Sequence, residues 1–287
     1  ANLWKSVICI GMGNEGASAG HTAGILKENT EERIPLAVQM KETAINVQIW
    51  KSYHDIVDIS LISPAGVQIG PIPEVIGTQR FVVGDTEILL YYGEPSPFHV
   101  SQEIFIEFLP KDSYITPGIW QFILTPRKIV TGEYDLWLPS ENVLNRGTAF
   151  RYPTERGTLT IPSTSQRVIS VGAYDSLTFA YADFSGRGGL EGESKPDLVA
   201  PGVDITAPTP SGIYQTFTGT SFATPFVSGA AALMMEWGIV RGNDPYLYGE
   251  KVKAYLRRGA RPLPGFTEYP NPQVGYGALC LRDGLPE

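Results

Sequence analysis

The sequence contains little of the residue types that build metal sites and disulfide frameworks. It has 2 cysteines and 3 histidines in 287 residues, and they show no metal-ligand spacing. Cys9 lies in the apolar run VICIG and is expected to be a buried, inert thiol, with a Cys9–Cys280 bridge as the open alternative. We therefore expect no metal, no cofactor and no disulfide framework.

Basic clusters and long apolar runs are also missing. The sequence has 22 Lys and Arg residues and 30 Asp and Glu residues, which gives a formal net charge of −8. Nucleic acids and anionic membranes bind clustered Lys and Arg, so we expect neither as a partner. No apolar stretch approaches the roughly 20 residues that cross a bilayer, and no signal peptide is recognised. A hydrophobic content of 43% with 18% charged residues is typical of a globular protein.

Three segments differ in their residue patterns. Residues 1–30 contain SVICIGMGNEG, an apolar run that ends in Gly-rich polar residues, as in a central parallel strand followed by a loop. Residues 31–147 form short alternating apolar and polar runs between Gly, Pro and Asp turns, which predicts an antiparallel sandwich or jelly roll. Residues 148–287 return to strands and helices. The outer segments are predicted to form one α/β domain that the middle segment interrupts.

The stretch FTGTSFATPFVSGAAALMM places Ser221 at the start of a helix predicted over residues 221–237, with Pro225 in its first turn. A hydroxyl at this position lies among free backbone N–H groups, which can hold a developing oxyanion. The same hydroxyl can instead be a simple N-cap, the commonest role of Ser at a helix start. Spacing alone favours the cap.

The full pattern GTSFATPFVSGAAAL resembles the nucleophile signature of the subtilisin-like serine peptidases at every fixed position: Gly219, Thr220, Ser221, Ala223, Pro225, Val227 and Gly229. Upstream, VISVGAYD, FSGRG and PDLVAPGVDI resemble that family's strand, loop and strand in the same order. The resemblance implies that Ser221 is the nucleophile and that Thr220 borders the bound substrate. It also implies a partial subtilisin-like parallel sheet with flanking helices.

The run GMGNEG, residues 11–16, is a second match to the same family. Subtilisin-like peptidases carry a Gly-Asn loop whose Asn side chain donates to the oxyanion, together with the backbone N–H of the nucleophile. The resemblance implies this role for Asn14. It also implies that Gly13, Glu15 and Gly16 border the pocket for the residue before the scissile bond.

The insertion and the tail narrow the resemblance. A jelly-roll-like insertion after the Asn loop, a return through TLTIPSTSQRVISVGAYD and a tail with EYPNPQVGYGALCL are similar to the clostridial Csp-type germination proteases. By analogy this implies a protein pro-segment as substrate, such as the precursor of a spore-cortex hydrolase. It also implies a spore-associated or extracytoplasmic location.

The base and the orienting acid of a serine peptidase are missing. The family carries them before the Asn loop, in His-Gly-Thr and Asp-x-Gly motifs, and neither motif occurs here. His21 follows the Asn loop and is expected to be a loop or substrate-edge residue, whereas His54 and His99 are expected on the surface of the sandwich. Because the chain starts at Ala1 close to a core strand, we expect the protein to be longer on that side or to have been cut. An N-terminal portion that carries Asp and His is the expected partner, and the chain alone is expected to be inactive.

The predicted function is a serine endopeptidase that forms an acyl-enzyme. A pseudoprotease that holds a partner in the cleft or on the sandwich is the alternative, and the upstream motifs distinguish the two. A third hypothesis gives the sandwich aromatics a glycan-binding role, although aromatics at alternating strand positions are more often core.

Overall fold

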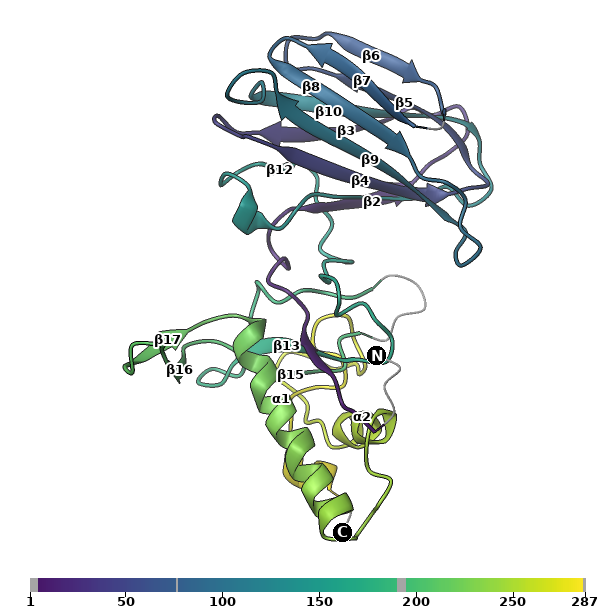
Figure 1. Ribbon diagram of the computed structural model, residues 1–287. Coiled ribbons are helices and arrows are strands. Elements are labelled where there is room, and N and C mark those ends of the chain that lie inside the picture. Colours follow the sequence, from purple (N-terminus) through teal and green to yellow (C-terminus); the bar gives the residue numbers. More distant parts are fainter. Residues whose placement is uncertain (1–4, 76, 190–194, 286–287) are drawn as a thin grey trace. The chain divides into compact units, whose positions relative to one another are not determined.

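The computed structural model describes residues 5–75, 77–189 and 195–285 (Figure 1). The chain divides into two compact units, one of Ala1–Ala17 with Glu155–Glu287 and one of Ser18–Thr154. The domain limits expected from the sequence, 1–30, 31–147 and 148–287, stay predictions. Ala1, where the sequence suggests a cut, lies outside the described residues.

The first unit contains a small mixed sheet. Strand β1 (Cys9–Gly11) pairs in parallel with β13 (Ile169–Asp175), which also pairs in parallel with β15 (Leu198–Pro201). Strand β14 (Ala180–Tyr181) joins β13 in the antiparallel direction, so the parallel sheet expected from the sequence is in fact mixed. Strand β13 reads ISVGAYD and is buried at its first six residues, as a strand covered on both faces requires.

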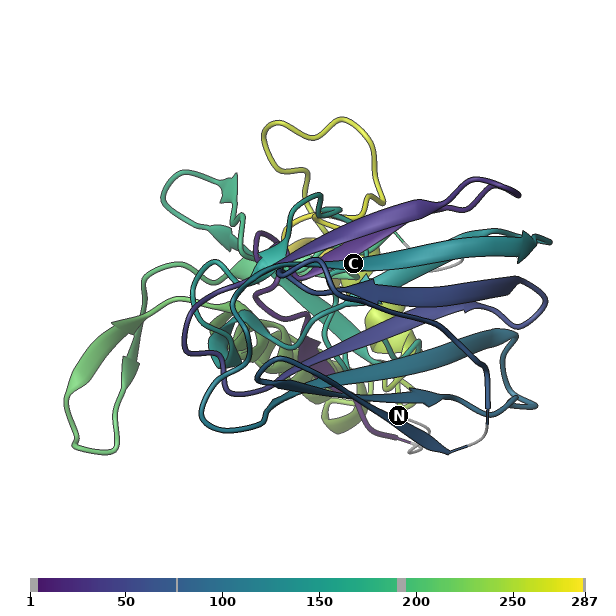
Figure 2. The same cartoon turned by 90° about the horizontal axis from the view of Figure 1, so that it is seen from above.

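A β-hairpin projects from this unit just before the long helix that begins at Thr220. Strands β16 (Ile205–Pro208) and β17 (Tyr214–Phe217) form a two-stranded antiparallel sheet of their own. The hairpin projects from the rest of the first unit in both views (Figures 1 and 2). Tyr214 is 72% exposed within it, so the hairpin adds little to the core.

The long helix α1 (Thr220–Met235) packs on the sheet of the first unit and continues into the π-helical turn η2 (Glu236–Val240). Small residues let α1 lie close to the chain that follows β15. A Cβ at Gly202 would lie only 3.3 Å from the Cβ of Ala223 in the helix. Helix α2 (Glu250–Arg258) and the short α3 (Leu281–Gly284) follow. The buried side chains that α1 contributes to the core are Ala223, Val227, Ala230, Ala231 and Met234.

Two details of α1 differ from the sequence-based expectations. Pro225 is the sixth helical residue and not part of the first turn, so the helix lacks the N–H that would donate to the carbonyl of Ser221. The stretch Thr220–Val240 is long and apolar enough to cross a membrane by length and composition, with a mean hydropathy of 1.2. A single such helix is weak evidence for a membrane span, because the core helix of a domain has the same properties. One face of α1 packs on β1, β13 and β15, and 33% of the apolar window is buried.

The second unit consists of two antiparallel sheets. The five-stranded sheet has the order β12-β3-β10-β5-β6, and the six-stranded sheet has the order β2-β11-β4-β9-β8-β7. Their bounds are β2 (His21–Ile25), β3 (Glu32–Val38), β4 (Ile45–Ser52), β5 (Ile56–Ile62), β6 (Gln68–Ile72), β7 (Thr78–Val83), β8 (Thr86–Tyr92), β9 (Ser101–Pro110), β10 (Gly118–Lys128), β11 (Glu133–Trp137) and β12 (Ala149–Phe150), with the 3-10 helix η1 (Glu141–Val143). The jelly-roll arrangement of this insertion stays a prediction.

Both sheets contribute to one hydrophobic core. Strand β4 reads INVQIWKS, and Ile45, Val47 and Ile49 lie on its buried face, as the alternation predicts. At the centre, Phe108 of β9 packs edge-on against Trp120 and Phe122 of β10. These three rings are fully buried, so the core role expected for most strand aromatics is confirmed for them.

Both cysteines are free thiols. Cys9 in β1 and Cys280 at the start of α3 are half-buried. Burial raises the pKa of the Cys9 thiol. A thiol with a raised pKa carries little thiolate at neutral pH and is therefore a poor nucleophile.

Candidate active site

Ser221 is an exposed residue in the first turn of α1. The N-cap is Gly219 and not Ser221, so the structure places the serine two residues further along the chain than the cap. Gly219 has a φ of 150° and a ψ of 160°. The position favours glycine because of this φ and because a Cβ there would lie 3.2 Å from Nδ2 of Asn14.

The side chain of Asn14 lies against the backbone that leads into Ser221. Its Oδ1 accepts hydrogen bonds from the backbone N–H of Thr220 at 3.0 Å and from the Thr220 hydroxyl at 3.2 Å. One of the orphan N–H groups at the start of α1 is thereby satisfied. Because Oδ1 is the acceptor here, the Nδ2 group lies on the side of Gly219. The two motifs that the sequence singled out therefore meet.

The backbone of the Asn14 loop has no room for larger residues. Gly13 has a φ of +92°, and a Cβ at this position would lie 2.5 Å from the side chain of Thr160. A Cβ at Gly16 would lie 2.1 Å from the carbonyl oxygen of Ser185. Glu15, between Asn14 and Gly16, is half-buried. The glycines thus have a structural reason to be present, whatever a substrate requires of them.

Hydrogen bonds tie this loop to the strands around it. The N–H of Met12 donates to the carbonyl of Val171 in β13 at 3.0 Å. The N–H of Thr160 donates to the carbonyl of Met12 at 3.1 Å. The buried Met12 side chain adds packing under the loop. The loop that carries Asn14 is therefore anchored at Met12 to β13 and to Thr160.

Two residues near Ser221 were not singled out in the sequence. Phe222 stacks on Phe217 at the end of β17, with ring centroids 4.9 Å apart and planes within 13°. This stack holds the hairpin against the first turn of α1. In the sequence, the two phenylalanines are visible only as the ends of FTGTSF. Their spacing does not predict a stack unless the turn between them is known.

None of the three histidines offers a base within the described part of the first unit, because all three belong to the second unit. His21 is not a loop or substrate-edge residue: it opens strand β2 and is 2% exposed. Its Nε2 lies 2.8 Å from Oδ1 of Asp135, and its ring stacks on Trp137 at 4.6 Å. These contacts with β11 explain its burial. His54 and His99 are exposed, as the sequence predicts.

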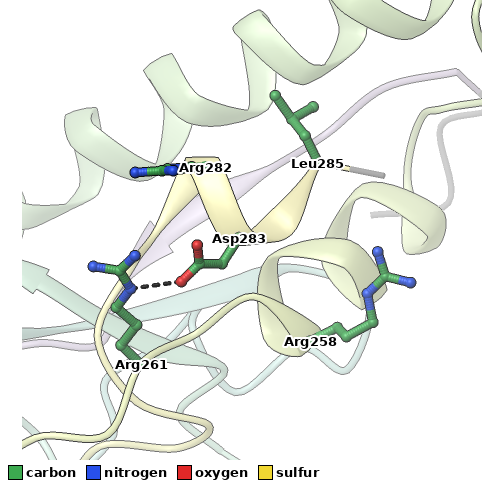
Figure 3. Close-up of a pocket in the computed structure, with 5 residues that line it drawn as sticks. All are labelled: Arg258, Arg261, Arg282, Asp283 and Leu285. Carbon is green, nitrogen blue, oxygen red and sulfur yellow. Dashed lines mark hydrogen bonds and ion pairs between the residues drawn. The ribbon is translucent and has the colours of Figure 1, made fainter. Parts of the chain in front are cut away.

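A separate pocket lies beside α2 and α3 (Figure 3). Its lining includes Nε of Arg261, which donates to Oδ2 of Asp283 at 2.6 Å. This hydrogen bond lowers the pKa of the Asp283 carboxyl. None of the site residues expected from the sequence lines this pocket, whose wall is formed by Arg258, Arg261, Arg282, Asp283 and Leu285. Across the described ranges no three His, Cys, Asp or Glu side chains gather in a way that would hold a metal ion.

The chain is similar to several known proteases. Residues 152–277 match the family model described as the subtilase family, Peptidase_S8. The serine protease AprX of Bacillus subtilis is 35% identical over 150 residues, which are 45% of this chain and 32% of that protein. The intracellular serine protease of Paenibacillus polymyxa is 38% identical over 105 residues, 35% of this chain and 30% of that protein.

A solved structure extends the similarity to nearly the whole chain. The Clostridium perfringens CspB protease has a TM-score of 0.91 and 40% identity to this chain, and the match covers 99% of this chain and 59% of that one. The chain thus spans about a third of the curated relatives named above and little more than half of CspB. From these matches, residues 152–277 are similar to the subtilase family, peptidase S8, and the chain is similar in structure to the CspB protease.

Proposed function

We propose that this chain is the C-terminal part of a subtilisin-like serine endopeptidase that acts through an acyl-enzyme. The family match and the protease relatives support a serine peptidase. The observation that carries the finer proposal is the position of Asn14. Its amide lies against Gly219 and Thr220, directly before the exposed Ser221.

In the proposed reaction, Oγ of Ser221 attacks the carbonyl carbon of the scissile peptide bond, and its proton passes to a base. The backbone N–H of Ser221 and the Nδ2 group of Asn14 donate to the resulting oxyanion. The C–N bond then breaks, the base gives the proton to the leaving amine, and an ester on Ser221 remains. Water hydrolyses this ester in a second round of the same steps. Gly13, Glu15, Gly16 and Thr220 are proposed to border the bound substrate.

We propose that the base and the acid come from an N-terminal portion of the same protease. Strand β1 is the last strand on its side of the described sheet, so its outer edge is open for a further strand. Apolar residues on α1 are also uncovered, since Phe226 is 43% exposed and Leu233 is 54% exposed. Additional strands and helices would cover both features.

The proposed substrate is a protein or the pro-segment of one. The similarity to the CspB protease supports a proteolytic function, and the Csp-type resemblance suggests a spore-cortex hydrolase precursor and a spore-associated location. The proposed N-terminal portion would contribute the base side of the site, so the specificity would depend on that portion as well as on this chain.

Labelling with a fluorophosphonate tests the proposal. The chain is coexpressed with its N-terminal portion, and the covalent adduct is located by peptide mass spectrometry. We expect the adduct on Ser221, its loss in Ser221→Ala, and its retention in Ser228→Ala, a control at another exposed serine of α1. If the assembled wild-type protein is not labelled and cleaves no peptide, the pseudoprotease alternative replaces the enzyme.

A further inference from the structure

Arg187 is a buried cation near the Asn14 loop that the proposed reaction does not use. The residue is 8% exposed, and its guanidinium forms an ion pair with Glu155. The guanidinium carbon also lies 5.7 Å from the centroid of the Tyr181 ring. Its Nε is buried and has no hydrogen-bond partner among the described residues.

The segment that carries Arg187 holds the Asn14 loop from both sides. On one side, the N–H of Gly16 donates to the carbonyl of Phe184 at 2.9 Å. On the other, the N–H of Gly186 donates to the carbonyl of Gly13 at 3.0 Å. Asn14 lies between these two backbone hydrogen bonds, so a shift of residues 184–186 moves the backbone on either side of it.

Residues 185–187 are in turn fixed by their own contacts. The Tyr181 hydroxyl donates to the carbonyl of Ser185 at 2.5 Å, and the Arg187 guanidinium lies near the ring of the same tyrosine. The N–H of Arg187 donates to Oγ1 of Thr158 at 2.8 Å, and the N–H of Thr158 donates to the carbonyl of Arg187 at 2.9 Å. Arg187 thus joins Tyr181 on one side to Glu155 and Thr158 on the other.

We propose that Arg187 is a positioning residue for Asn14. By packing near Tyr181 and pairing with Glu155, it fixes the segment 184–187, and this segment fixes the loop that presents the Asn14 amide. An oxyanion donor acts only when it is already aimed at the position where charge develops, so residues that hold it contribute to turnover. The inference rests on the proposed function, because it assigns Asn14 the oxyanion role.

The energetic cost of burying Arg187 favours a role in positioning the Asn14 loop over a role in stabilising the fold. Burial of a cation with one unpaired N–H is costly, and an apolar side chain of similar size often gives equal or greater stability at such a place. The planar guanidinium can lie against an aromatic ring while it pairs with a carboxylate. Lysine provides the charge without this planar group, so Arg187→Lys separates geometry from charge.

The test compares Arg187→Lys and Arg187→Met with Arg241→Gln in the protease assembled with its N-terminal portion. Arg241 is an exposed arginine of the same unit that pairs with Glu236, so it is a matched control. We expect kcat to fall about tenfold or more in both Arg187 variants, with KM within about twofold of wild type. The fall in kcat should not exceed the roughly 10²- to 10³-fold loss that removal of an oxyanion donor causes. Arg241→Gln is expected to keep wild-type kinetics.

A second readout does not depend on activity. Amide hydrogen exchange is measured at Gly16 and Gly186 in this chain, and we expect faster exchange in both Arg187 variants but not in Arg241→Gln. Glu155→Gln, at a side chain that is 79% exposed, gives a milder change should Arg187→Met fail to fold. A lower Tm with unchanged kcat and unchanged exchange at these amides would overturn the proposal. Absence of turnover in the wild-type assembly would instead overturn the proposed function, and the exchange experiment would still test the role of Arg187.

Discussion

The carboxylate of Asp197 is fully buried and accepts a hydrogen bond from Nε of Arg257 at 2.6 Å. Its second oxygen accepts the backbone N–H of Ser170 in β13 at 2.6 Å, and Nζ of Lys253 lies 3.4 Å from the first. Arg257 and Lys253 belong to α2, so this carboxylate joins α2 to the central strand of the first unit. That strand also receives the N–H of Met12, at the base of the Asn14 loop.

Asp197→Asn is expected to lower the free energy of unfolding by about 3–5 kcal/mol, since loss of one partner of a buried ion pair leaves the other charges uncompensated. Urea denaturation followed by circular dichroism measures the change. Asp283→Asn is the matched control, because Asp283 pairs with Arg261 at the surface, where ion pairs contribute little. Equal loss in the two variants would show that burial of the Asp197 carboxylate does not matter.

Asn14→Ala is expected to lower kcat of the proposed assembled protease by roughly 10²- to 10³-fold with KM nearly unchanged, because the oxyanion donor that we propose Asn14 to be acts in the transition state. Steady-state kinetics on a peptide substrate measure both constants. Asn243→Ala is the control at an exposed amide of the same unit, whose Nδ2 donates to the carbonyl of Trp237. A raised KM with unchanged kcat would instead make Asn14 a residue that binds substrate.

The two site motifs could be predicted because each is a contiguous run of specific residue types. The TSFATPFV run and the MGNEG run are recognisable without knowledge of the fold, and so is the alternation that buries Ile45, Val47 and Ile49 in β4. The contact between the two motifs could not be predicted from the local sequence pattern. The hydrogen bond between Asn14 and Thr220 joins residues 206 positions apart, and it depends on how β1 and α1 pack on β13.

Isolated polar residues were beyond the reach of the sequence. Asp197 and Arg187 become significant only through partners that lie far away along the chain. His21 followed the Asn loop and therefore suggested a loop residue, but pairing of β2 with β11 buries it beside Asp135 and Trp137. Tertiary contacts overrode the local pattern in each case.

Gly16→Ala is expected to destabilise the first unit by about 1–3 kcal/mol and to abolish activity, because the added Cβ would lie 2.1 Å from a backbone oxygen that cannot move freely. Gly229→Ala is the matched change in α1, where a Cβ meets nothing within 4 Å. We expect this control to raise the stability of the chain by up to about 1 kcal/mol, since Ala favours helix over Gly. Thermal unfolding of both variants measures the contrast, and a stable Gly16→Ala protein would contradict the close approach.

The second unit is expected to lose stability in acid through Asp55. Burial raises the pKa of Asp55, but hydrogen bonds from the N–H groups of Val130, Gly132 and Thr131 outweigh it and hold the pKa below the ordinary value of 3.8. The folded state therefore binds this proton less well than the unfolded state. The stabilisation is present above pH 3.8 and is lost as the pH falls through the lowered pKa of the folded protein.

Thermal unfolding of the wild type and of Asp55→Asn between pH 6 and pH 2 checks this expectation. The difference in Tm should be largest at the high end of the range and should shrink in acid, where the wild-type carboxyl is also neutral. A constant difference across the range would mean that the charge of Asp55 contributes nothing and that only its shape matters.

Leu233→Asp is expected to weaken association with the proposed N-terminal portion without unfolding this chain. Leu233 is 54% exposed on α1, so a charge there costs the isolated chain little, whereas burial of a leucine side chain contributes about 1.5–3 kcal/mol to an interface. The Kd should therefore rise about tenfold or more, as measured by titration of the labelled N-terminal portion. Val143→Asp, at a side chain that is 69% exposed in the second unit, is the control and should leave the Kd unchanged. Equal Kd values for wild type and Leu233→Asp would show that the N-terminal portion does not cover this face of α1, and the donor of the base would have to reach Ser221 from another side.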